Sequence, residues 1–334
     1  MVRVFMEVVE MTGIDVLYVL GGLYLVWLLM SFKTSRPDGT YIKTHPYRRM
    51  MFFLFPTRNE SVVYFDDYVR VEKLLEWISE AKEKIHCDIT HAGVMGYALA
   101  IQANPKLDRF TVGRRLYQRK QTQVSFSMKR KKMGREAKIA VVKMGIESGD
   151  TLESYLGRIN KKIGFERTEA KTYTDKELGL FLKLPRPILN VAIRLFYWLD
   201  YHNCLPGAFI DNDVMYTSGF IANLGSLKMK AGYHHLYEWG TCPLFLMLGQ
   251  VEDRAMVEDG EVVARKVLHI RFSFDERVDD GLNAGKGINA LRRILEDPYR
   301  YFGDPKSDDF GSAAMTWAAD DARLPPGGTV ELSA

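Results

Sequence analysis

Cysteine is scarce in this 334-residue chain, and its distribution argues against two classes of fold. Cys87, Cys204 and Cys242 are odd in number and far apart, and neither a C-x-x-C pair nor a cysteine–histidine cluster accompanies them. The pattern supports neither a disulfide framework nor a zinc site, and it suits a reducing compartment. A net charge of +4 is mild, and without a DNA- or RNA-binding motif we expect no nucleic-acid partner.

One long apolar segment stands out against this composition. Residues 14–32 contain a single charge, Asp15, and a helix of that length would extend about 28 Å, enough for one bilayer crossing. A signal peptide fits poorly because the run is long and no small-x-small cleavage site precedes Lys33. A buried core helix also fits poorly, because apolar residues cover the whole circumference. We therefore expect a membrane anchor over residues 1–33, with membrane lipid as a partner, and a linker over residues 34–47.

The charges on either side of this segment predict its orientation. Acidic residues lie before it and in its first turn, and basic residues follow it: Lys33, Arg36, Lys43, Arg48 and Arg49. By the positive-inside rule, the main domain faces the cytoplasm. The expected location is the cytoplasmic membrane, crossed once.

The most informative motif lies near the C-terminus, where Ser273 to Gly281 read S-F-D-E-R-V-D-D-G. This segment resembles the active-site signature S-F-D-H-R-x-x-D-G of the acyltransferases that form the core of 2-oxoacid dehydrogenase complexes. That family shares its fold with chloramphenicol acetyltransferase. Every fixed position matches except one, where Glu276 replaces the catalytic histidine.

Other fragments resemble the same family and occur in the same order. They are the early helix around residues 90–107, G-F-I-A-N-L-G at 219–225, the hairpin at 248–263 and the helix with its L-E-x-P ending at 282–298. The resemblance implies an α/β fold with a mixed sheet flanked by helices, over residues 48–302. It also implies a homotrimer.

The resemblance further implies a chemistry. In the family, the histidine is the general base for a thiol of coenzyme A or dihydrolipoamide, and a serine hydroxyl stabilises the oxyanion formed by attack on an acyl thioester. The site lies between subunits. Asp280 and Gly281 are largely architectural, and Arg277 matches the family arginine. Asp280 is expected to pair with an arginine, for which Arg48 or Arg49 is a candidate.

Two departures from the family affect catalysis. A carboxylate such as Glu276 is ordinarily a weaker base than imidazole, with pKa values of about 4.3 against about 6.5, although burial makes some glutamates competent bases. Ala222 occupies the position of the serine, and loss of one oxyanion donor typically costs about 2.7–4 kcal/mol of transition-state stabilisation. A loose alignment places His235 near the reacting carbonyl, which suggests a Glu276–His235 dyad. The alternative is that His235 belongs to a polar turn.

Candidate coenzyme-binding residues come from two segments. Asn223 lies beside Ala222 in the matching strand, and Arg130 and Lys131 lie in a basic turn between two expected strands, at the hairpin that borders the family's substrate channel. These cations suit the phosphates of coenzyme A or of an acyl carrier. Anionic lipid headgroups or plain solvent are the alternatives.

A hydrophobic insertion at about residues 173–212 has no counterpart in the family. Its residues 188–199 predict a strongly apolar helix, which would make a peripheral membrane contact, pack on the domain or cover an acyl chain. Residues 50–55 form a second apolar run, expected either in interfacial lipid or as a buried strand. Residues 303–334 read as a flexible tail.

Two hypotheses follow. The first is a membrane-anchored acyltransferase that uses an acyl-CoA or acyl-carrier thioester with a hydrophobic acyl chain or acceptor. The second is an inactive trimeric scaffold that organises membrane-associated enzymes, and a pure thioester-binding module is a weaker third. Because no lipoyl domain is found in this sequence, a covalent lipoyl group is not expected.

Overall fold

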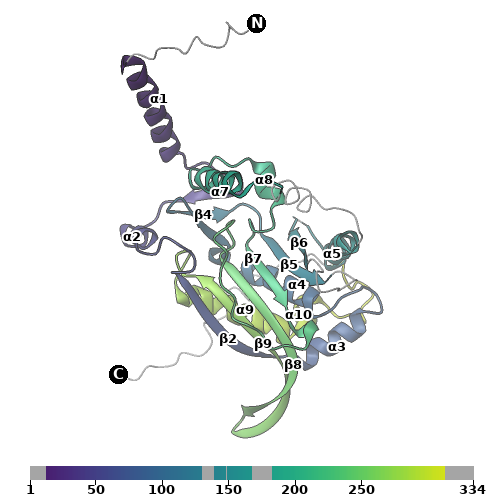
Figure 1. The fold of residues 1–334 in the computed structure, drawn as a ribbon. Coiled ribbons are helices and arrows are strands. Elements are labelled where there is room, and N and C mark those ends of the chain that lie inside the picture. Colours follow the sequence, from purple (N-terminus) through teal and green to yellow (C-terminus); the bar gives the residue numbers. More distant parts are fainter. Residues whose placement is uncertain (1–12, 130–138, 148, 168–182, 313–334) are drawn as a thin grey trace, which may run out of the picture.

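The computed structural model describes residues 13–129, 139–147, 149–167 and 183–312 (Figure 1). Its central element is a six-stranded sheet in the order β2-β9-β8-β7-β5-β6. The strands are β2 (Val62–Arg70), β5 (Gln123–Lys129), β6 (Ile139–Gly145), β7 (Gly219–Asn223), β8 (Leu244–Glu258) and β9 (Glu261–Asp275). β7 runs parallel to β5 and β8, and the other pairs are antiparallel. The predicted mixed α/β sheet is confirmed.

Helices cover one face of this sheet and form the main core. They are α3 (Glu72–Ala81), α4 (Ile89–Ala103), α5 (Leu152–Glu166), α9 (Gly281–Glu296) and the short α10 (Pro298–Phe302). α4 is buried along nearly its whole length because glycines let its neighbours approach. A Cβ at Gly96 would lie 3.0 Å from Leu291 of α9, and one at Gly93 would lie 2.8 Å from Leu248 of β8. These positions tolerate no larger side chain without a shift.

The other face of the sheet is covered by an irregular segment, residues 228–243. Leu236 and Cys242 from this segment pack with Phe220, Phe245 and Met247 in a smaller apolar cluster. The segment follows a short 3₁₀ turn, η2 (Gly225–Leu227), and returns the chain to the start of β8. Strand β7 and the β8–β9 hairpin are therefore joined by a segment that lies across the sheet.

A small second sheet lies near the C-terminal end of the N-terminal helix. It has the order β1-β4-β3, with β1 (Gly39–Ile42), β3 (Arg109–Val112) and β4 (Arg115–Arg119). The turn between β3 and β4 consists of Gly113 and Arg114, both at positive φ, and β3 follows a 3₁₀ turn, η1 (Pro105–Asp108). β1 comes from the expected linker.

The remaining helices gather at the end of the molecule from which α1 (Gly13–Phe32) projects (Figure 1). They are α2 (Pro46–Leu54), α7 (Arg186–Tyr201) and α8 (Gly207–Asn212). α7 matches the helix predicted within the insertion. The alternative of a buried strand at residues 50–55 is wrong, because these residues belong to α2 and the segment after it, where Phe52 alone is buried.

Residues 303–312, the described part of the expected tail, contact the domain. Trp77 Nε1 donates to the carbonyl of Gly303 at 2.8 Å, and the Phe310 ring lies 6.0 Å from that of Trp77. Lys306 pairs with Glu80 at 2.6 Å. Residues 313–334 lie outside the described part of the chain.

Candidate functional site

The signature loop begins with a buried ion pair. Asp275 ends β9, and its two carboxylate oxygens accept from Arg277 Nε at 2.9 Å and Nη2 at 2.8 Å. Ser61 Oγ donates to the same carboxylate at 2.8 Å. Both charged side chains are almost fully buried. The hydrogen bond from Ser61 therefore helps to offset the cost of removing the two charges from water. Arg277, which matches the family arginine, therefore holds the signature loop by pairing with Asp275.

The next acidic residues organise the start of α9. The N–H of Asn283 donates to Asp280 Oδ1 at 3.0 Å, which makes Asp280 the N-cap of α9. The expected ion pair between Arg48 and Asp280 is wrong by one position, because Arg48 Nη2 lies 3.7 Å from Asp279. Arg109 Nη1 approaches the same Asp279 at 3.3 Å. Gly281 opens the helix, and a Cβ there would meet nothing within 4 Å, so packing does not explain this glycine.

We expect Asp280→Ala to lower the free energy of unfolding by about 1 kcal/mol, because the N-cap is lost. Asp280→Asn keeps an acceptor oxygen at this position and is expected to lose only a few tenths of that value. Urea unfolding of the purified protein would measure both. Equal losses for the two variants would contradict the capping role.

Glu276 follows Asp275 and differs from its acidic neighbours. Its backbone N–H donates to the carbonyl of Ser61 at 3.0 Å, which fixes the loop. Its carboxylate, half-buried, makes no hydrogen bond or ion pair with any described residue. Asp275, Asp279 and Asp280 are all engaged, so Glu276 is the acid of this loop that is free to act on a ligand.

His235 lies in the irregular segment on the outer face of the sheet. It is exposed, and its Nδ1 lies 3.0 Å from the carbonyl oxygen of Leu236. Its ring stacks on His234, which in turn stacks on Phe245 with centroids 4.0 Å apart. Burial lowers the pKa of His234. No hydrogen bond or ion pair among the described residues joins His235 to Glu276, and the dyad stays a hypothesis.

A cavity of about 310 Å³ lies at the far end of β7, beside Ala222 and Asn223. Asn223 Nδ2 donates to Thr90 Oγ1 at 3.0 Å, and the N–H of Ser226 donates to Asn223 Oδ1 at 3.1 Å. A larger cavity of about 740 Å³ shares Asp88, Thr90, Asn223 and Ser226 with the first. Asn223 therefore lies where two hollows meet, and polar groups from β7 and the start of α4 surround it.

The sequence did not mark four of these polar residues as site residues: His86, Asp88, Thr90 and His91. The start of the early helix, Thr90-His91, was the available signal. His91 is buried, and the N–H of Asp88 donates to its Nδ1 at 3.2 Å. The same Nδ1 lies 2.8 Å from Asp88 Oδ1, and Nε2 lies 3.1 Å from Asn160 Oδ1. Both nitrogens of His91 are thus occupied, and its role is structural.

Glu276 and Ala222 lie far apart along the sheet. Ala222 pairs with Met247, and Met247 pairs with Arg271 of β9. Glu276 is five residues beyond Arg271, which corresponds to about 17 Å along the strand. Within one chain, the Glu276 carboxylate therefore cannot reach a group bound at Ala222 and Asn223.

The predicted coenzyme-binding cations are placed as follows. Arg130 and Lys131 lie outside the described residues. Lys82 and Lys228, which the sequence analysis did not single out, line the larger cavity near Asn223. No described group of three or more histidine, cysteine, aspartate or glutamate side chains could hold a metal ion.

Comparison with known proteins relates part of this chain to one family of acyltransferases. Residues 212–302, from the end of α8 to α10, match the family of 2-oxoacid dehydrogenase acyltransferases (catalytic domain). The acetyltransferase component of the pyruvate dehydrogenase complex of Bacillus subtilis is 43% identical over 53 residues, which are 16% of this chain and 12% of that protein. The lipoamide acyltransferase component of the branched-chain complex of Pseudomonas putida is 41% identical over 51 residues, 15% of this chain and 12% of that protein. The matched segment is thus about an eighth of the length of these relatives.

Solved structures extend the likeness to most of the chain. A probable dihydrolipoamide acetyltransferase from Listeria monocytogenes superimposes with a TM-score of 0.51 at 14% identity, over 77% of this chain and 94% of that one. The cubic core of the pyruvate dehydrogenase multienzyme complex gives 0.50 at 15% identity, over 78% and 93%. The dihydrolipoamide acetyltransferase of Azotobacter vinelandii, studied for the role of a serine, a histidine and an asparagine in its mechanism, gives 0.50 at 14% identity, over 78% and 93%. The predicted fold and the predicted relationship are confirmed.

Proposed function

Because residues 212–302 relate this chain to the catalytic domain of the 2-oxoacid dehydrogenase acyltransferases, we propose that it is a membrane-anchored acyltransferase whose site is shared between copies of a homotrimer. One observation supports the proposal above all. A free carboxylate, Glu276, lies about 17 Å along the sheet from an open polar cavity at Ala222 and Asn223. Such a separation suits a site that a neighbouring copy completes.

The proposed substrate is an acyl thioester of coenzyme A or of an acyl carrier. The larger cavity offers the chain's own Lys82 and Lys228 to phosphate groups, and the smaller one offers Asn223 and Thr90 to the acyl group. Arg130 and Lys131 remain proposed phosphate contacts. The α1 helix is the proposed anchor, since its window Asp15–Phe32 has a mean hydropathy of 1.8 and contains no buried residue. The main domain then faces the cytoplasm.

The proposed reaction transfers the acyl group to a thiol or hydroxyl acceptor. Glu276 of one copy takes the acceptor's proton as the acceptor oxygen or sulfur attacks the thioester carbonyl in the neighbour's cavity. The tetrahedral oxyanion collapses, the carbon–sulfur bond breaks and the thiolate leaves, taking up the proton from Glu276. Ala222 replaces the serine that stabilises the oxyanion in the family. In this chain, Thr90 is the proposed hydroxyl donor to the oxyanion. Thr90 Oγ1 accepts from Asn223, and its own hydrogen has no acceptor among the described residues.

We expect Glu276→Gln to lower thioester turnover by about 100-fold, because the acceptor would lose its general base. Detergent-purified protein would be followed by thiol release from a panel of acyl-CoAs. Glu261→Gln is the matched control, since Glu261 is an exposed carboxylate at the start of β9, the strand that Glu276 follows, and it should leave turnover unchanged. His235→Ala tests the dyad in the same assay.

The second candidate function is an inactive scaffold that organises partner enzymes at the membrane, and the replacements at Ala222 and Glu276 favour it. Its expected result is different. The unmutated trimer would be folded but silent with every thioester, and Glu276→His would not restore turnover. That outcome would overturn the acyltransferase proposal.

A further inference from the structure

The inserted helix α7 has a wide apolar side made of two adjacent stripes, only one of which packs on the domain. Its inner face packs on the domain through partly buried residues: Leu189, Ala192, Ile193, Phe196 and Leu199. Its outer face presents Ile188, Val191, Leu195 and Trp198, whose exposed fractions are 53%, 67%, 52% and 40%. The spacing of three and four residues places these four on one stripe. The domain therefore covers only part of the apolar side of α7, and the exposed stripe needs a second apolar environment.

A second exposed apolar helix lies beside α7. α2 presents Tyr47, Met50, Phe53 and Leu54, which are 55% to 76% exposed. The two helices are neighbours, because Phe52 of α2 and Tyr197 and Tyr201 of α7 line one cavity of about 250 Å³. Together they form an apolar face, defined here as the exposed side chains of α2 and α7. Scattered apolar residues on a surface are ordinary, but two adjacent helices that both expose a stripe indicate a binding surface.

The exposed charges on the two helices of the apolar face are positive. Arg186 and Arg194 of α7 and Arg49 of α2 are exposed, and Arg114 lies over the ring of Phe53 at 4.6 Å. The two helices contain one acidic residue, Asp200, which is paired with Arg36 at 2.8 Å. Arginine at the edge of an apolar stripe, together with tryptophan and tyrosine, is typical of a helix that lies in the headgroup layer of a bilayer.

The joint between α1 and α7 determines where a bilayer would lie. The carbonyl of Lys33 accepts from Asn203 Nδ2 at 2.9 Å, directly after the last turn of α7. Lys33 Nζ donates back to the carbonyl of Asn203, and Arg115 donates to the carbonyl of Ser31. These bonds attach the C-terminal end of α1 to the C-terminal end of α7.

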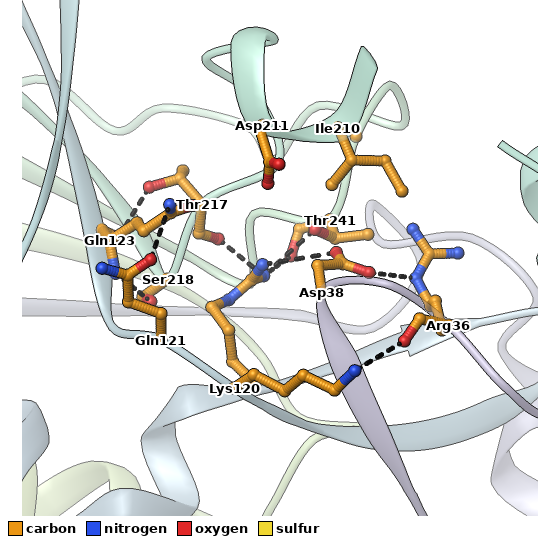
Figure 2. A network of polar contacts seen from close by, with 12 residues as sticks. Arg36, Asp38, Lys120, Gln121, Gln123, Ile210, Asp211, Thr217, Ser218 and Thr241 are labelled. Carbon is orange, nitrogen blue, oxygen red and sulfur yellow. Dashed lines mark hydrogen bonds and ion pairs between the residues drawn. The ribbon is translucent and has the colours of Figure 1, made fainter. Parts of the chain in front are cut away.

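Arg36 holds the same joint from inside. Its guanidinium pairs with Asp38 at 2.6 Å (Figure 2). It also pairs with Asp200 of α7 at 2.8 Å and donates to Asn203 Oδ1 at 3.3 Å. The Arg36 side chain is fully buried. α1 is therefore fixed to α7 rather than connected by a free linker, and a bilayer crossed by α1 begins at the level of α7 (Figure 1).

We infer that the apolar face of α2 and α7 lies in the headgroup layer of the bilayer that α1 crosses, so that each copy rests on the membrane with this end of the domain. The inference rests on the proposed membrane anchor. It assigns the outer stripe of α7 to lipid rather than to a protein partner. Such a helix is buried about 5–10 Å into the boundary between headgroups and acyl chains.

The test uses the full-length protein in bilayer discs of phosphatidylcholine and phosphatidylglycerol, with and without bromine on the acyl chains. In a Cys204→Ser background, one environment-sensitive fluorophore is placed at Val191→Cys on α7, at Leu23→Cys on α1 or at Val262→Cys. Val262 is the matched control, because it is 72% exposed and lies in the β8–β9 hairpin at the opposite end of the molecule (Figure 1).

We expect bromine to quench the label at position 191 by about half as much as the label at position 23, and to leave the label at position 262 nearly unchanged. Quenching at 23 without quenching at 191 would overturn the inference and leave the anchor intact. A blue-shifted but unquenched label at 191 would overturn it in favour of a protein partner or a second copy. Without quenching at 23, the proposed anchor itself would fail, and the inference with it.

Discussion

Two inactive variants are expected to regain about one third of the normal turnover when they are combined in one trimer. The first variant, Glu276→Gln, lacks the free carboxylate. The second, Asn223→Ala, lacks the amide at the meeting point of the two cavities. Each is expected to be at least about tenfold slower than the unmutated protein, for the loss of a base or of a positioning group.

The expected recovery follows from the separation of the two residues. If each site takes Glu276 from one copy and Asn223 from the next, a closed trimer has three such sites. In a trimer of mixed composition, one site always combines an intact Glu276 with an intact Asn223. The other two sites contain at least one altered residue, so about one site in three is active whichever variant is in excess.

Co-expression with two different affinity tags, followed by purification through both, yields the mixed oligomers. The matched controls carry both tags on the same variant and should remain inactive. No recovery in the mixed sample would contradict a shared site. Recovery of about one half would indicate a two-fold dimer, in which one of two sites is intact.

The sequence could predict the fold well because local signals agree there with the family pattern. The 248–263 hairpin contains Asp259-Gly260, and both residues take positive φ at its turn, as a two-residue hairpin requires. The helix after the signature begins at Gly281 and is capped by Asp280, which the motif itself contains. The apolar residues at 188–199 alone identified α7.

The candidate site was harder to predict because its contacts join distant segments. Arg48 pairs with Asp279 rather than with Asp280. Which of two neighbouring aspartates faces an arginine depends on the direction in which the loop turns. The cavity at Asn223 combines β7 with the start of α4, which lies over a hundred residues earlier in the chain. The distance between Glu276 and Ala222 follows from strand register, which neither motif contains.

The buried charge cluster around Arg119 is the other place where a single substitution should have a large effect. The Arg119 side chain is 2% exposed and lies between Asp38, at 3.6 Å, and Asp108, at 3.5 Å. Its Nη2 donates to the carbonyl of Thr217 at 2.9 Å and to Thr241 Oγ1 at 3.0 Å (Figure 2). Burial lowers the pKa of Arg119, although an arginine remains charged.

This cluster connects the contact between α1 and α7 to the core of the domain. Asp38 receives Arg36 on one side and Arg119 on the other, and Arg36 continues to Asp200 of α7. Two buried arginines thus face three largely buried aspartates, Asp38, Asp108 and Asp200, and removal of Arg119 leaves Asp108 without an ion pair to any described residue. Breaking a buried pair by removing one partner usually costs about 3–5 kcal/mol, because the remaining charge stays desolvated.

We therefore expect Arg119→Met to lower the free energy of unfolding by about 3–5 kcal/mol, measured by urea unfolding in detergent. Arg293→Met is the control, since no described residue forms an ion pair with Arg293, and it should change the value by less than about 0.5 kcal/mol. Adding Asp108→Asn to Arg119→Met removes one of the stranded charges, so the double variant should be more stable than Arg119→Met alone. If the double variant were less stable instead, the loss would come from packing and from the carbonyl acceptors of Arg119. The cluster around Arg119 would then be stabilised by packing and hydrogen bonds rather than by its ion pairs.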